Sequence, residues 1–267
     1  MTKCNFKRSL GAAVVAAGLV TSQAVEATTV DLTGNNNSGT INGALFYYTD
    51  QQPTGTGVID PFLRLQDAPN EQGYNTSGGT PLDTKAGIYT HDITFADLSS
   101  STTTINGVLY YTVLLDVNEA SGKKSIISLD QLQFYTSSVG SQTTTDVSSL
   151  GTLRYTFDPG DYVLLDYARN SGSGTGDMYA YIPASYFAGT LQTDFVYLYS
   201  EFGYTAAADS NSEAGFEEWS LIRNTSPDTG GRPVSDEMPA WLAGGVLASL
   251  CLIDLNRRRR RKTTSLS

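Results

Sequence analysis

The sequence predicts an all-β fold, an antiparallel β-sandwich or jelly roll, for the middle of the chain. The 267 residues are rich in Thr, Ser, Gly, Asn and Tyr, and β-branched and aromatic residues favour strands. Short apolar or alternating segments recur between turn residues, as they do in antiparallel sheets. No long amphipathic helical pattern lies between the two ends. These observations favour one sandwich-like domain.

Nine segments have the length and composition expected of strands, and each is bounded by turn residues. The expected strands are residues 45–49, 62–65, 108–116, 129–135, 153–157, 162–166, 178–182, 195–202 and 216–222. The Gly- and Ser-rich segment 170–177 is expected to form a turn or a ligand loop at the edge of the sandwich.

Two Asn-Gly pairs, Asn42-Gly43 and Asn106-Gly107, occupy the same place in two similar segments, residues 40–47 and 104–111. Asn-Gly beside alternating residues is a strong signal for a tight β-hairpin. The similarity between the two segments is explained either by independent selection of good turn residues or by duplication of a domain. We expect a single domain, residues 28–230.

The first 27 residues have the three parts of a secretory signal peptide. Lys3, Lys7 and Arg8 precede an apolar stretch at 10–20, and small residues follow, with cleavage expected after Ala24 or Ala27. A retained N-terminal transmembrane helix is the alternative, but the apolar stretch is shorter than the roughly 20 residues that a bilayer requires.

The C-terminal end has the pattern of a membrane anchor. A linker, residues 231–237, leads to an apolar helix expected at 238–256 and a basic tail at 257–267. Because basic residues remain cytoplasmic, the domain is expected outside the membrane and the tail inside. An ordinary buried helix and a nucleic-acid-binding tail are less consistent with six consecutive basic residues beside a signal peptide.

A Pro-containing start, a short Gly/Ala/Leu-rich helix and a terminal Arg run, paired with a signal peptide, resemble the PEP-CTERM sorting signal of exopolysaccharide-producing Gram-negative bacteria. Glu237-Met238-Pro239 stands in place of the usual Pro-Glu-Pro, and Asp254 interrupts the end of the helix. The resemblance implies an exosortase-type partner that processes the tail and releases or transfers the domain. A plain C-terminal anchor is the alternative. The residues assigned to the sorting signal are Met238, Pro239, Arg257, Arg258, Arg259, Arg260 and Arg261.

The interior is also similar to a subgroup of PEP-CTERM exported proteins. The matching stretches are residues 53–62, 71–76, 90–92, 114–119, 128–130 and 215–219. This resemblance implies a location at the cell surface, in the extracellular matrix or in a membrane-anchored precursor. It implies no catalytic residue.

Composition limits the partners and the source of stability. Cys4 lies in the signal and Cys251 in the anchor, so the domain has no cysteine for a disulfide. Residues 28–236 carry 24 Asp plus Glu and 8 Lys plus Arg. That surface disfavours nucleic acid and anionic lipid and favours solubility and uptake of divalent cations.

The residues exclude several enzyme classes. His91 is the only histidine, so a multi-histidine zinc site is excluded, and a Ser-His-Asp triad would require His91 itself. Paired carboxylates could hydrolyse glycosides. Glu217 and Glu218 are adjacent on an expected strand, so they point to opposite faces and cannot form such a pair, whereas Glu217 with Asp116 is unconstrained by sequence.

Calcium is the one cofactor that the sequence leaves open, because hard cations prefer carboxylate and carbonyl oxygens. Neither candidate loop matches an EF-hand, and solvated turn acids are the alternative. The candidate ligands are Asp116, Asn118, Glu119, Asp158 and Asp161.

The expected function is that of a non-enzymatic secreted or cell-surface protein, a matrix- or exopolysaccharide-associated adhesion or carbohydrate-binding module. Tyr110/Tyr111, Tyr179/Tyr181 and Tyr197/Tyr199 place rings on strand faces, where tyrosines stack on sugars or pack in the core. A polysaccharide-active enzyme, a glycoside hydrolase or lyase, is the competing class.

Overall fold

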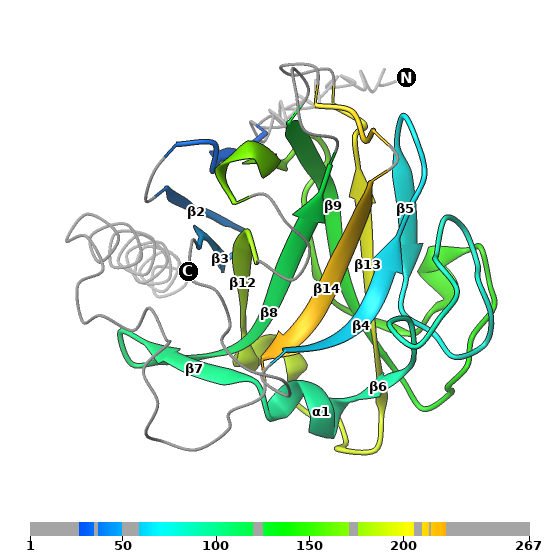
Figure 1. Ribbon diagram of the computed structural model, residues 1–267. Helices are drawn as coiled ribbons and strands as arrows, with labels where there is room; N and C mark the ends of the chain where they lie inside the picture. Colours follow the sequence, from blue (N-terminus) through cyan, green and yellow to red (C-terminus); the bar gives the residue numbers. More distant parts are fainter. Residues whose placement is uncertain are drawn as a thin grey trace, which may run out of the picture.

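Two β-sheets with very little helix form the part of the chain that the computed structural model describes (Figure 1). The described residues are 27–34, 37–49, 59–119, 125–170, 176–205, 210–213 and 215–222. The all-β prediction is confirmed for this region. The expected signal peptide (apart from Ala27), linker, C-terminal helix and basic tail lie outside it. Within the described residues, no helix has the length and hydropathy needed to cross a membrane.

Sheet A has the strand order β1-β11-β9-β13-β5, with β10 paired to β9 and β6 paired to β13. Every pairing is antiparallel except that of β1 with β11. Its strands are β1 (Thr29–Asp31), β5 (Glu71–Tyr74), β6 (Ile93–Thr94), β9 (Ile126–Ser137), β10 (Thr152–Thr156), β11 (Tyr162–Asp166) and β13 (Phe195–Phe202).

Sheet B has the order β2-β3-β12-β8-β14-β4, with β7 paired to β8, and is antiparallel throughout. Its strands are β2 (Ser38–Ile41), β3 (Ala44–Tyr48), β4 (Ile59–Leu65), β7 (Thr102–Ile105), β8 (Val108–Asn118), β12 (Met178–Pro183) and β14 (Phe216–Ile222). The adjacent strands β4, β14 and β8 carry the residues of greatest functional interest.

Helical structure among the described residues is limited to short connections. They are α1 (Phe95–Ser99), η1 (Val147–Ser149), η2 (Tyr167–Arg169) and η3 (Ala184–Phe187). Helix α1 begins with a capping box, in which Thr94 and Asp97 exchange side-chain to backbone hydrogen bonds. Phe95 and Leu98 on this helix are buried against the core.

Both Asn-Gly pairs form the tight hairpin turns that the sequence predicts. Asn42 and Gly43 connect β2 to β3 with φ of 46° and 81°, and Asn106 and Gly107 connect β7 to β8 with φ of 50° and 78°. Positive φ at both central residues defines a turn whose twist matches the flanking strands. Each hairpin fixes the register of a strand that enters sheet B.

A single large hydrophobic core joins the inner faces of the two sheets. Phe134 and Leu198 of sheet A and Phe46, Val113 and Trp219 of sheet B belong to it, and all five are fully buried. The Trp219 indole N–H donates to the Ser200 hydroxyl at 3.1 Å, so a hydrogen bond also links β14 to β13 across the core. Because successive side chains on a strand point to opposite faces of the sheet, every second residue of these strands points into the core.

All nine predicted strands are present, with shifts of at most a few residues at their ends. Five further strands, β1, β2, β5, β6 and β7, were not predicted. They have two to four residues each, and segments such as Glu71–Tyr74 and Thr102–Ile105 lack an apolar run. These short strands are stabilised by pairing with longer neighbouring strands. Sequence periodicity cannot predict this, because it contains no information on which strands pair.

Candidate functional site

A row of charged residues crosses three adjacent strands of sheet B. In the register of the sheet, Glu218 on β14 lies opposite Asp116 on β8 and opposite Arg64 on β4. Their neighbours Leu115, Val117, Glu217 and Trp219 are fully buried, so strand alternation places the charged row on the outer face of the sheet.

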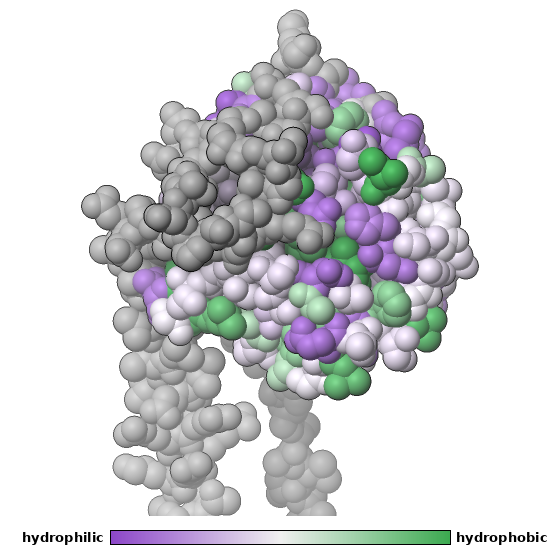
Figure 2. Space-filling view, turned by 60° about the horizontal axis from the view of Figure 1, so that its bottom comes forward, coloured by the Kyte–Doolittle hydropathy of each residue, from purple (hydrophilic) through white to green (hydrophobic). Residues whose placement is uncertain are grey.

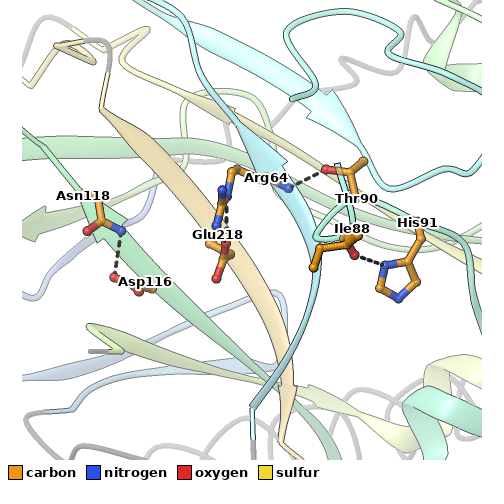
Figure 3. Close-up of polar contacts among 7 residues, drawn as sticks. All are labelled: Arg64, Ile88, Thr90, His91, Asp116, Asn118 and Glu218. Carbon is orange, nitrogen blue, oxygen red and sulfur yellow. Dashed lines mark hydrogen bonds and ion pairs between the residues drawn. The ribbon is translucent and has the colours of Figure 1, made fainter. Parts of the chain in front are cut away.

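Arg64 is held on this face by an ion pair, which is drawn in Figure 3, and by contacts with two aromatic rings. Its Nε donates to Glu218 Oε2 at 2.8 Å, and a second guanidinium nitrogen also contacts that oxygen. The guanidinium carbon lies 4.2 Å from the Tyr89 ring centroid and 4.4 Å from that of Phe216. Cation–π contacts and a two-nitrogen ion pair therefore fix the orientation of the guanidinium.

The segment before β6 supplies the exposed part of the site. Ile88 is 80% exposed and Tyr89 is 40% exposed. The Thr90 hydroxyl accepts a hydrogen bond from the Arg64 backbone N–H at 3.2 Å, and His91 Nδ1 lies 3.2 Å from the Ile88 carbonyl (Figure 3). His91 thus has a local contact within the segment, and the segment presents an aromatic ring beside a cation.

We call Arg64, Tyr89, Phe216, Glu218 and Asp116 the Arg64 platform. Asp116 also accepts a hydrogen bond from Asn118 Nδ2 at 3.1 Å (Figure 3). The platform combines two aromatic rings, a fixed guanidinium and two carboxylates, which are groups that bind polar ring-shaped ligands. Tyr89 is its exposed aromatic residue, whereas Asp116 and Glu218 are only 5% and 8% exposed. On the face shown in Figure 2, the apolar residues of the described surface form separate small areas among polar ones.

Most of the tyrosines that the sequence places on strand faces are buried. Tyr110, Tyr179 and Tyr181 form a cluster with Leu45 and Leu114, separate from the central core, and their exposed fractions are only 6% or 7%. Tyr111 packs in the central core. Packing, rather than an open stacking surface, accounts for these four rings.

Tyr197 and Tyr199 belong to a second satellite cluster, on sheet A, with Tyr74, Tyr135 and Leu150. The Tyr74 hydroxyl donates to the Thr144 carbonyl at 2.8 Å and the Tyr197 hydroxyl donates to the Val139 carbonyl at 2.8 Å. Burial raises the pKa of both hydroxyls to about 12. These two hydrogen bonds hold the loop between β9 and β10 against sheet A.

Asp177, immediately before β12, lies in a position that is almost closed to water. It is 2% exposed, its Oδ2 accepts a hydrogen bond from the Val117 N–H at 2.8 Å, and its Oδ1 has no hydrogen-bond partner among the described residues. Burial raises the pKa of this carboxyl to about 8, and the charge of Asp116 adds to the shift while Arg169 opposes it. Asp177 therefore binds a proton at neutral pH.

Glu217 and Glu218 point to opposite faces of β14, as strand geometry predicts. Glu218 pairs with Arg64 outside, whereas Glu217 is fully buried between the sheets beside Glu71 of β5. Glu217 and Asp116 therefore lie on different faces of sheet B, and the register places Glu218 opposite Asp116 instead. The only same-face carboxylate pair that this row offers is Asp116 with Glu218.

The five candidate calcium ligands lie in two separate places. Asp116, Asn118 and Glu119 lie at the end of β8, where Glu119 accepts a hydrogen bond from the Glu213 N–H at 2.8 Å. Asp158 and Asp161 lie in the turn between β10 and β11, where Asp161 accepts hydrogen bonds from backbone N–H groups of Thr28 at 2.6 Å and Asp158 at 3.1 Å.

Calcium at these two places stays a prediction. Among the residues described by the structure, no group of three or more His, Cys, Asp or Glu side chains is arranged to hold a metal ion. The turn acid Asp161 has a structural role, because its carboxylate accepts the Asp158 N–H within the turn and the Thr28 N–H next to β1. The sorting-signal residues Met238, Pro239 and Arg257 to Arg261 lie outside the described residues.

Sequence reasoning did not identify Arg64, Tyr89, Phe216 or Glu71 as candidate site residues. Glu71 and Phe216 fall within stretches 71–76 and 215–219, which the family resemblance already singled out. Arg64 and Tyr89 carry no such signal, because their contact depends on a connection that brings residue 89 back to β4.

Searches against protein-family models, curated proteins and solved structures found no match for the chain.

Proposed function

We propose that this chain is an exported, non-enzymatic surface protein that binds extracellular polysaccharide through the Arg64 platform. The observation that carries the proposal is the exposed Tyr89 ring against a guanidinium that Glu218 and Phe216 hold in place. A pre-oriented aromatic and charged surface loses little conformational entropy when a sugar binds. Sugar rings stack on aromatic faces, and their hydroxyls donate to carboxylates and accept from guanidinium groups.

The proposed location rests on the two ends of the sequence. The signal-peptide pattern of residues 1–27 supports export, and the PEP-CTERM-like pattern of residues 238–267 supports sorting by an exosortase-type enzyme. The acidic surface and the absence of cysteine from residues 28–230 are compatible with a protein outside the cell. The chain would then act at the cell surface, in the extracellular matrix or as a membrane-anchored precursor.

A glycan array on the purified full-length protein tests the proposal. We expect wild-type protein to bind a subset of polysaccharides and Tyr89→Ala to bind them about 5- to 30-fold more weakly, since one good stacking contact contributes on the order of 1–2 kcal/mol. Tyr204→Ala is the matched control, because Tyr204 is 45% exposed but follows β13 of sheet A. Equal loss in both variants, or no binding by wild type, would contradict the proposal.

A polysaccharide-active enzyme is the second candidate, and the pairing of Asp116 with Glu218 across β8 and β14 favours it. Directly opposed residues have Cβ atoms about 4.5–5.5 Å apart. Side chains that start this close can bring their carboxyl groups to the roughly 5–5.5 Å separation of retaining glycosidases. Release of reducing sugar from a bound glycan, abolished in Asp116→Asn, would replace the binding proposal with this one. Binding without release supports the binding protein.

A further inference from the structure

We propose that Glu71 and Glu217 bind a divalent cation of the calcium type between the two sheets. Glu71 comes from β5 of sheet A and Glu217 from β14 of sheet B, and both residues are 0% exposed. Each carboxyl is among the groups that act most strongly on the pKa of the other, so the two side chains lie close together. The site is therefore a pair of acids that meet in the interior from opposite sheets.

The hydrogen bonding of this pair is incomplete within the described part of the chain. Neither carboxylate oxygen of Glu217 has a protein donor as partner there, and the same is true of Glu71 Oε1. Glu71 Oε2 accepts a hydrogen bond from the Asp67 N–H at 2.9 Å. Three buried oxygens thus lack a donor at one interior position, and an unsatisfied buried carboxylate costs several kcal/mol in typical proteins.

The charges that act on this pair are negative. The charged groups that act most strongly on Glu217 are the carboxylates of Glu71, Glu119 and Asp116. Arg64, the cation on the neighbouring strand, pairs with Glu218 on the other face of sheet B. A bound cation would neutralise two apposed carboxylates without changing the packing around them, and a proton shared by the two acids is the competing arrangement.

The donor chemistry favours a hard divalent cation. Calcium is bound by carboxylate and backbone carbonyl oxygens in flexible geometries, and magnesium demands a stricter octahedron. Among the described residues, no group of three or more Asp, Glu, His or Cys side chains is placed to hold a metal ion. The proposed site therefore has two carboxylates as its charged ligands, and backbone carbonyls or water complete the coordination.

Such a cation would link the two sheets at one end of the sandwich. Glu119, whose charge also acts on Glu217, accepts the Glu213 N–H and so connects the end of β8 to the segment before β14. The stretches 71–76, 114–119 and 215–219 all contribute to this region. Because the site is interior, it is separate from the Arg64 platform and does not depend on the proposed polysaccharide binding.

The test is calcium titration of the full-length protein after dialysis against a chelator. We expect saturable binding of one calcium ion per chain by calorimetry. At about a hundred times the dissociation constant, calcium should raise the melting temperature by roughly 5–10 °C. Glu217→Gln and Glu71→Gln should each abolish both responses.

Two comparisons make the test decisive. Glu217→Gln should melt no lower than wild type in the chelator, because the substitution removes a buried ionisable group, so loss of calcium binding cannot be attributed to unfolding. Glu201→Gln, on β13 next to β5, is the matched control and should keep wild-type calcium binding. Absence of binding to wild type, or calcium binding retained by Glu217→Gln, would overturn the proposal and leave a shared proton between the two acids.

Discussion

Replacing Asp177 with Asn should change how the stability of the domain depends on pH. The carboxyl is buried, and its pKa is raised to about 8, against about 3.9 in an unfolded chain. Between these values the folded state holds a proton that the unfolded state has released. The stability contributed by that proton is complete below the unfolded pKa and is lost as pH rises through the folded pKa.

The magnitude follows from one proton per molecule. One proton changes the free energy of unfolding by about 1.4 kcal/mol per pH unit. From pH 5 to pH 7, wild-type protein should therefore lose up to about 3 kcal/mol through this residue, and water that reaches the buried site would reduce the value. The amide introduced by Asp177→Asn does not titrate, and its oxygen can still accept the Val117 N–H that Asp177 accepts at 2.8 Å.

The assay is urea unfolding of both proteins at half-unit pH intervals from 5 to 8, with a chelator present. Other buried acids, such as Glu71, Glu217 and Asp130, have raised pKa values in both proteins, so the difference between the two stability curves isolates Asp177. We expect Asp177→Asn to gain stability relative to wild type as pH rises. A difference that is constant from pH 5 to pH 7 would refute a neutral Asp177.

Substitutions in the two hairpin turns and in the core, and the mass of the exported product, give three further tests. Gly107→Ala should cost about 1 kcal/mol of folding free energy through its positive φ alone, whereas Gly43→Ala should cost more, because an added Cβ would lie 2.6 Å from the Tyr186 hydroxyl; equal costs in thermal unfolding would contradict this. Trp219→Phe should lose about 2–4 kcal/mol, from lost volume and the lost hydrogen bond to Ser200, in urea unfolding, and a loss below about 1 kcal/mol would refute it. Mass spectrometry of the exported product should find the segment from about residue 238 onward missing, and recovery of the intact basic tail would rule out processing.

The sequence predicted the long strands well because local chemistry determines them. The segments 162–166, 195–202 and 216–222 coincide with β11, β13 and β14. Asn42-Gly43 and Asn106-Gly107 form their hairpins because few other residues adopt two consecutive positive φ values at low cost. The opposite orientations of Glu217 and Glu218 followed from strand alternation alone.

The candidate sites could not be predicted in the same way. Arg64 and Glu218 are 154 residues apart, and their contact depends on which strands are neighbours in sheet B and on the register between them. The contact of Glu71 with Glu217 depends further on how sheet A packs against sheet B. Neither strand order nor sheet packing leaves a periodic signal in the sequence.

The sequence by itself thus determined the all-β class, the long strands, the two tight turns and the exclusion of multi-histidine and disulfide chemistry. Those features depend on residue type and short-range spacing. Only the tertiary structure decided which acids are buried, which acid forms an ion pair with Arg64 and which tyrosines remain exposed. The reason is physical: the ionisation and exposure of a side chain depend on its neighbours in space, and residues distant in the sequence supply most of those neighbours.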